Sequence, residues 1–307
     1  MASMRPSAAP SLASLIARRH QALRDHVRSA RRGDVEGVHQ ARVASRRLRE
    51  AVPVLGRGLD DVRLKPLRRR LRDLTRALGP VRELDVAGEM VEGYAWQGRD
   101  AVRLRRAWLR DLAHRRREPV VELRTALART HLAALESALD AFEAARAASA
   151  DLAWRTALAR RLADRAQDLR DRIVRTGDRY HPEPLHEVRI AAKKLRYALE
   201  ITAESGLVGL VRPLASLKAA QEALGRLHDL DVLTTLLREL PEAAPGEDLQ
   251  HEAARVAGAL EAESAALHAR YLRAAAGLVR IADDTLDRIV PRVRGQVPRA
   301  LGRTDGR

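Results

Sequence analysis

One basic helical motif occurs twice in the sequence, and this repeat constrains the fold more than any other feature. The first copy, HQARVASRRLR, covers residues 39–49, and the second, HEVRIAAKKLR, covers residues 186–196. The chain has 307 residues, so each half holds one copy. A second motif repeats as well, LGPVRELDV at 78–86 and LGRLHDLDV at 224–232. Two matched motifs at matched spacing predict a tandem duplication of one helical unit of about 140 residues.

Each copy of the first motif predicts an amphipathic helix with one basic face. At about 100° per residue, positions 0, 3, 7 and 10 fall within one arc roughly 80° wide. The opposite face is apolar and includes Leu48 in the first copy and Leu195 in the second. The basic arc begins with a histidine both times and is formed by His39, Arg42, Arg46 and Arg49, and by His186, Arg189, Lys193 and Arg196.

Composition indicates an all-α fold. Alanine and leucine dominate the apolar residues, aromatic residues make up 3% of the chain, and β-branched residues are scarce. We expect two four-helix-bundle units, related by a pseudo-two-fold axis that makes the two histidine helices equivalent. Their predicted limits are 11–148 and 149–290, with a disordered tail at 1–10 and a flexible tail at 291–307.

Helical periodicity and turn residues also predict where the helices begin and end. Gly33 is expected to end the first helix and Asp34 to cap the second, while Gly79-Pro80 is expected to separate two helices. The predicted helices cover approximately residues 11–31, 35–55, 61–78, 81–96, 99–117, 119–146, 151–176, 185–204, 208–224, 227–240, 249–276 and 278–290.

Several classes of protein are excluded or disfavoured by what the sequence lacks. The absence of cysteine excludes disulfides and thiolate metal sites. No uncharged apolar run of about 18 residues occurs, so no membrane span is expected. The first residues do not resemble a secretory signal, and a cytoplasmic location is therefore expected. No Gly-rich phosphate loop, HExxH or Gly-x-Ser-x-Gly motif is present, so we expect neither a cofactor nor a catalytic metal.

Charge indicates a polyanionic partner. The net charge is +16, and residues 1–150 hold 31 Lys and Arg against 18 Asp and Glu, a net +13. Each basic face extends about 15 Å along its helix, which suits a linear polyanion better than a single phosphate. Arginine binds phosphate through a planar fork, and lysine adds a mobile point charge. The next helix of each unit is expected to add Arg72 and Lys218, which are equivalent in the repeat.

The roles of the repeated acidic and histidine residues stay open at this point. Asp85 and Asp231 could each hold an arginine in its rotamer or cap a helix. Neighbouring cations should keep His39 and His186 neutral, and a bound phosphate chain should raise their pKa again. Binding is therefore predicted to be stronger below about pH 6.5. The alternative is that both histidines are packing residues at duplicated positions.

Taken together, these motifs resemble the conserved-histidine α-helical domain (CHAD) family. The family signature is similar to His-x-x-Arg-(Val/Ile)-x-x-(Arg/Lys)-(Arg/Lys)-Leu-Arg, and the second motif resembles its later Leu-Gly-x-x-(Arg/His)-Asp-x-Asp-Val element. Glu83 stands where Asp is usual. The resemblance covers about residues 11–290, as the doubled motif and the repeat spacing indicate.

The resemblance implies a non-catalytic protein that binds inorganic polyphosphate through basic faces lining a central groove, with association to polyphosphate granules. No CYTH triphosphatase domain is expected, because no Glu-x-Glu-x-Lys segment occurs. Asp85 and Asp231 are expected to support the binding residues. These are expected to be His39, Arg42, Arg46, Arg47, Arg49, Arg72, His186, Arg189, Lys193, Lys194, Arg196 and Lys218.

Two alternative functions remain at the level of sequence. The first is binding of DNA or RNA, which the charge alone suggests and which scarce aromatic residues disfavour. Weak nucleic-acid binding through counterion release is expected in any case. The second is phosphoryl transfer or hydrolysis that uses His39 and His186. No oligomeric state is predicted.

Overall fold

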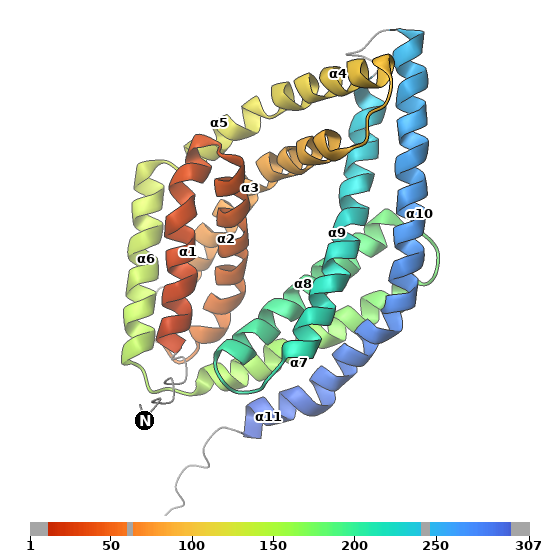
Figure 1. The fold of residues 1–307 in the computed structure, drawn as a ribbon. Helices are drawn as coiled ribbons and strands as arrows, with labels where there is room; N and C mark the ends of the chain where they lie inside the picture. Colours follow the sequence, from red (N-terminus) through yellow and green to blue (C-terminus); the bar gives the residue numbers. More distant parts are fainter. Residues whose placement is uncertain (1–11, 60–63, 241–245, 296–307) are drawn as a thin grey trace, which may run out of the picture.

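The computed structural model describes residues 12–59, 64–240 and 246–295, and within these ranges all regular structure is helical (Figure 1). This confirms the all-α fold class. The predicted tail at 1–10 lies outside the described residues, as do residues 296–307. The last helix extends to Gly295, so the predicted tail at 291–307 begins inside a helix.

Among the described residues, six α-helices form the first half of the chain. Five α-helices form the second half, with a short π-helical turn before the last of them. The first six are α1 (Leu12–Arg32), α2 (Val35–Leu55), α3 (Leu64–Gly93), α4 (Arg99–Arg115), α5 (Arg117–Ala126) and α6 (Arg129–Ala148). The remainder are α7 (Ala153–Thr176), α8 (Pro182–Glu204), α9 (Val211–Glu239), α10 (Glu247–Asp284), the π-helical turn Thr285–Ile289 and α11 (Val290–Gly295).

Local sequence signals predict the ends of several helices correctly. The Asp34 carboxylate accepts a 2.7 Å hydrogen bond from the backbone N–H of Gly37 and so caps α2. Gly33 follows α1 with φ at +85°, and Gly177 and Gly206 follow α7 and α8 with φ at +62° and +72°. These values lie in the left-handed region that favours glycine at a helix end.

The predicted break at Gly79-Pro80 is wrong, because α3 runs through both residues. Inside a helix, proline removes one backbone hydrogen bond and its ring clashes with the carbonyl one turn earlier, so the continuous helix has a local cost that other contacts must offset. Leu78 and Val81, on either side, are fully buried, and their burial favours a continuous helix. The side chain of Arg42 also donates to the carbonyl oxygen of Gly79, at 2.8 Å.

Other predicted boundaries also differ from the structure. A single helix, α9, replaces the two predicted at 208–224 and 227–240, since Leu224 and Leu227 both lie in the core. The helix predicted at 119–146 is two helices, α5 and α6, which meet at Leu127. At the C-terminal end, α10 runs through Gly277 without a break.

The order of packing is the same in the two halves of the chain. Helix α2 packs between α1 and α3, and α8 packs between α7 and α9. This arrangement accords with the predicted duplication, which stays a prediction together with its boundary near residue 148. The motif helices α2 and α8 are thus the central helices of their halves.

Within the part of the chain that the structure describes, hydrophobic contacts join the two halves in two regions. Helix α2 packs against α7 and α8, within the larger hydrophobic core. A second, separate core forms where the distal parts of α3 and α4 meet α9 and α10, and it buries Val91, Trp108 and Leu233. In Figure 1 this second meeting place lies at the top, where α4 reaches α10. The two joins fix the position of α2 relative to α8.

A membrane-spanning helix is not found among the described residues, since none of their helices is both long and apolar enough.

Candidate polyanion-binding groove

Two neighbouring cavities lie between the motif helices. Their volumes are about 520 Å³ and 290 Å³, and we call them together the central groove. Side chains from α2, α3, α8 and α9 line both cavities, and α7 adds to the larger one. Seven residues border both cavities, namely Arg42, Arg46, Glu83, Arg189, Lys193, Tyr197 and His228.

The structure brings ten of the twelve predicted binding residues to this groove. Both basic arcs face it, because the apolar sides of α2 and α8 are buried in the core. The ten residues are His39, Arg42, Arg46, Arg49, Arg72, His186, Arg189, Lys193, Lys194 and Arg196. Arg47 and Lys218 do not line it.

Four half-buried basic side chains form the centre of the groove, Arg42 and Arg46 from α2 and Arg189 and Lys193 from α8. Burial and the repulsion of the three arginines lower the pKa of Lys193 to about 6. Burial, followed by repulsion from Arg46, lowers the pKa of Arg42 to about 10. Desolvation and like charge both disfavour the charged form, so the cluster has more positive charge than its surroundings compensate.

Hydrogen-bonding partners for these cations are few. Within the described parts of the chain, Arg46 and Lys193 make no hydrogen bond or ion pair. The Nε of Arg189 is buried and has no partner among the described residues. Buried donors are normally satisfied. The centre of the groove therefore offers several N–H donors to an anion.

Two of the carboxylates that border the groove moderate this charge at its centre, and no role was predicted for them from sequence. Glu83 and Asp229 border the groove from equivalent positions of the second motif, on α3 and α9. The Oε1 of Glu83 lies 4.0 Å from Nη2 of Arg42. Burial raises the pKa of Asp229, and the charge of Arg189 opposes this. Their shared place in the repeat was the signal that could have found them.

His228 is a further groove residue, and it was not predicted from sequence. Its Nδ1 lies 3.1 Å from Nδ1 of His186, and Nη2 of Arg189 lies 3.3 Å from the same His186 atom. An arginine can only donate, so Nδ1 of His186 accepts the hydrogen bond from Arg189. Burial, with the charge of Arg189, lowers the pKa of His228 to about 3.

The two motif histidines are neutral near pH 7. Burial is the largest cause that lowers the pKa of His39, and the charge of Arg82 adds to it. Burial and the charge of Arg189 lower the pKa of His186. His39 and His186 therefore contribute to the predicted gain in binding at low pH together with Lys193, whereas His228 stays neutral in the same range.

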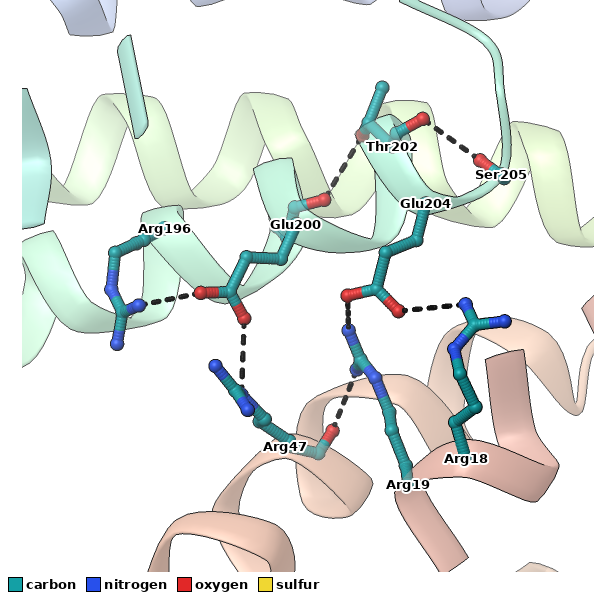
Figure 2. Close-up of polar contacts among 9 residues, drawn as sticks. Arg18, Arg19, Arg47, Arg196, Glu200, Thr202, Glu204 and Ser205 are labelled. Carbon is teal, nitrogen blue, oxygen red and sulfur yellow. Dashed lines mark hydrogen bonds and ion pairs between the residues drawn. The ribbon is translucent and has the colours of Figure 1, made fainter. Parts of the chain in front are cut away.

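Arg47 and Arg196 belong to an ion-pair network that joins α2 to α8 (Figure 2). Glu200 lies between them, 3.3 Å from Nε of Arg47 and 2.5 Å from Nη1 of Arg196. One turn further along α8, Glu204 accepts a 2.9 Å hydrogen bond from Arg19 of α1. Arg19 also donates to the backbone carbonyl of Arg47 at 3.1 Å. Arg47 thus contributes to the join between the halves.

The remaining predicted residues occupy different environments. Lys218 is exposed on α9 and lies 3.8 Å from Glu222. Asp85 is buried and accepts a 2.5 Å hydrogen bond from Nε of Arg116, the residue between α4 and α5, so it holds an arginine outside the groove. Asp231 accepts a short hydrogen bond from the Tyr180 hydroxyl.

Metal-ligand geometry occurs away from the motif histidines. Within the part of the chain that the structure describes, the cluster that fits a metal ion is His20, Asp140 and Glu143, between α1 and α6. Nδ1 of His20 lies 3.4 Å from Glu143, and Arg24 donates to Asp140 at 2.5 Å. That arginine already neutralises part of the acidic charge that a cation would need.

The geometry defines an all-α protein with a cation-lined groove between two helical halves. The family model of the CHAD domain matches residues 14–238, which is most of the chain, and the chain therefore belongs to the CHAD family. The match ends within α9, so α10 and α11 lie beyond it.

Two solved structures share the fold. The CHAD domain from the plant Ricinus communis is 22% identical, with 93% of this chain and 95% of that chain covered at a TM-score of 0.59. PptA from Streptomyces chartreusis is 17% identical, with 86% of this chain and 97% of that chain covered at a TM-score of 0.60. The search of curated proteins found no match.

Proposed function

We propose that this protein binds inorganic polyphosphate in the central groove, without chemical change of the ligand. The observation that carries the proposal is the cluster of Arg42, Arg46, Arg189 and Lys193, which faces one cavity from two helices and has few partners of its own. A linear polyanion supplies a negative charge at each phosphate, so it can neutralise cations along the whole groove. Membership of the CHAD family supports this choice of ligand.

The lining of the groove favours a polyanion without bases over nucleic acid. Tyr197 is the aromatic ring that borders both cavities, and its ring already stacks under the Arg196 guanidinium, 5.0 Å away. Single-stranded nucleic acids usually bind through rings that are free to stack with bases. We also propose that polyphosphate binding holds the protein at cytoplasmic polyphosphate granules.

Competition binding at about 0.15 M salt tests the proposal, because surface charge effects are largely screened there. Labelled long-chain polyphosphate bound to the protein is challenged with unlabelled polyphosphate, duplex DNA and single-stranded RNA. We expect polyphosphate to compete at least about 100-fold better, and the variant Arg46→Ala/Lys193→Ala to lose this preference, since each strong charge-assisted contact is worth about 1.5–3 kcal/mol.

The matched control removes the same charge elsewhere. Arg106→Ala/Arg110→Ala changes two exposed arginines of α4 that do not line the groove. Equal loss of affinity in both variants, or equal competition by RNA, would contradict groove binding. Release of orthophosphate from polyphosphate on addition of a divalent ion would contradict the non-catalytic role and favour phosphoryl chemistry at His39 and His186.

A further inference from the structure

A second basic cavity continues from the central groove over the start of α3. Its volume is about 910 Å³, and α3 lines it together with the α5–α6 junction. Arg68 and Arg72 border both this cavity and the larger cavity of the groove. The two spaces are therefore neighbours with a shared wall of two arginines. Beyond that wall the cavity is bordered by Lys65, Arg69 and Arg70, which we call the α3 shelf.

The shelf has a large excess of positive charge. Its three residues are exposed, and Asp73 is the carboxylate that borders the cavity. Asp73 lies 3.8 Å from Nε of Arg69 and also pairs with Arg76. Lys65 and Arg70 make no hydrogen bond or ion pair with any described residue. About three consecutive helical turns, 65–76, thus present cations over about 17 Å.

This charge is specific to the first half of the chain. The repeat places Val211, Ala215 and Ser216 of α9 at the positions of Lys65, Arg69 and Arg70. Arg212 and Lys218 are the basic residues in the equivalent stretch, 211–222. The core position Leu71 is kept as Leu217, so the helices correspond while the charges do not. A requirement of the fold would place the same residues in both halves.

We propose that the α3 shelf is a second anion-binding subsite, which holds the part of a long polyphosphate chain that extends out of the central groove. This inference rests on the proposed function and adds a direction to it, since the polyphosphate would leave the groove over α3 and not over α9. A polyphosphate short enough to fit in the groove would not reach the shelf. The shelf therefore makes affinity depend on chain length.

The test compares tripolyphosphate with long-chain polyphosphate on the full-length protein. The variant Lys65→Gln/Arg69→Gln/Arg70→Gln removes the shelf and leaves Arg68 and Arg72 in place. We expect its affinity for the long chain to fall about tenfold or more, with a salt dependence about two units less steep, and its affinity for tripolyphosphate to stay unchanged. The control Arg106→Gln/Arg110→Gln/Arg117→Gln removes the same charge from exposed positions on α4 and α5.

Each other result overturns the inference in a recognisable way. If the shelf variant binds the long chain as tightly as wild type, or if the control loses as much affinity, no subsite exists on α3. If the shelf variant loses RNA binding and keeps long-chain binding, the shelf serves nucleic acid instead. If the wild-type protein melts cooperatively and binds neither tripolyphosphate nor long-chain polyphosphate, the proposed function itself is wrong, and the shelf proposal falls with it.

Discussion

Lys193 should take up a proton when polyphosphate binds. Its side chain lies among Arg42, Arg46 and Arg189, with Arg196 further along the same helix, and its pKa is lowered to about 6. At pH 7.5 the ligand-free protein therefore holds this amine mainly uncharged. Phosphate oxygens beside it favour the ammonium form and raise its pKa in the complex.

The size of the effect follows from the shift. With a pKa of about 6 in the free protein and a charged lysine in the complex, affinity falls roughly 15-fold between pH 6 and pH 7.5. Nearly one proton is taken up for each binding event at pH 7.5. Well below pH 6 the lysine is already charged, so further gain comes from His39 and His186, whose pKa values are also lowered.

Calorimetric titration at pH 7.5 in two buffers with different ionisation enthalpies measures the uptake directly. Lys193→Arg keeps a positive charge at all these pH values, so it should abolish most of the uptake and flatten the pH profile between 6 and 7.5. Lys218→Arg, at an exposed lysine outside the groove, should leave both unchanged. The reasoning is refuted if wild type and Lys193→Arg show the same uptake and the same pH profile.

Three further predictions concern the fold and the groove. Gly225→Ala should raise the free energy of unfolding by about 0.5–1 kcal/mol, because a Cβ there meets open space. Gly79→Ala should show no such gain in urea melts, since its Cβ would lie 3.3 Å from Nη1 of Arg42; equal gains would argue against this contact. Trp108→Ala should lower the free energy of unfolding by about 3–5 kcal/mol in the same assay, and substitution of the half-exposed Trp96 by alanine should lower it less. A loss below about 1 kcal/mol for Trp108→Ala would mean that the second core contributes little to stability. Long-chain polyphosphate should raise the melting temperature of wild type more than that of Arg46→Ala/Lys193→Ala, and equal shifts would show that it binds elsewhere.

The basic arcs could be predicted from sequence because they depend on helical periodicity alone. Spacing places Arg42 and Arg46 on one side of α2 whatever the rest of the chain does. The facing of α2 and α8 across one groove depends on contacts between distant segments, which no local pattern encodes. Arg47 illustrates the limit, since its place in the motif suggested binding and its contact with Glu200 is visible only in the fold.

Helix breaks were predicted less well where burial opposes a local signal. Pro80 disfavours a continuous helix by itself, yet Leu78 and Val81 are buried on either side of it and α3 continues. His228 was missed for a different reason. The equivalent residue of the first half is Arg82, so the repeat pointed to a variable basic position and gave no hint that two imidazoles would meet.

The uncompensated charge at the centre of the groove should affect how fast the protein is degraded in the cell. Cations that repel one another lower the stability of the empty fold, and a ligand that binds only the folded state restores it in proportion to the logarithm of its concentration. Proteases act mainly on chains that have opened. The cellular amount of this protein would therefore rise and fall with the concentration of its polyanion, because degradation would remove the ligand-free protein faster than the bound protein.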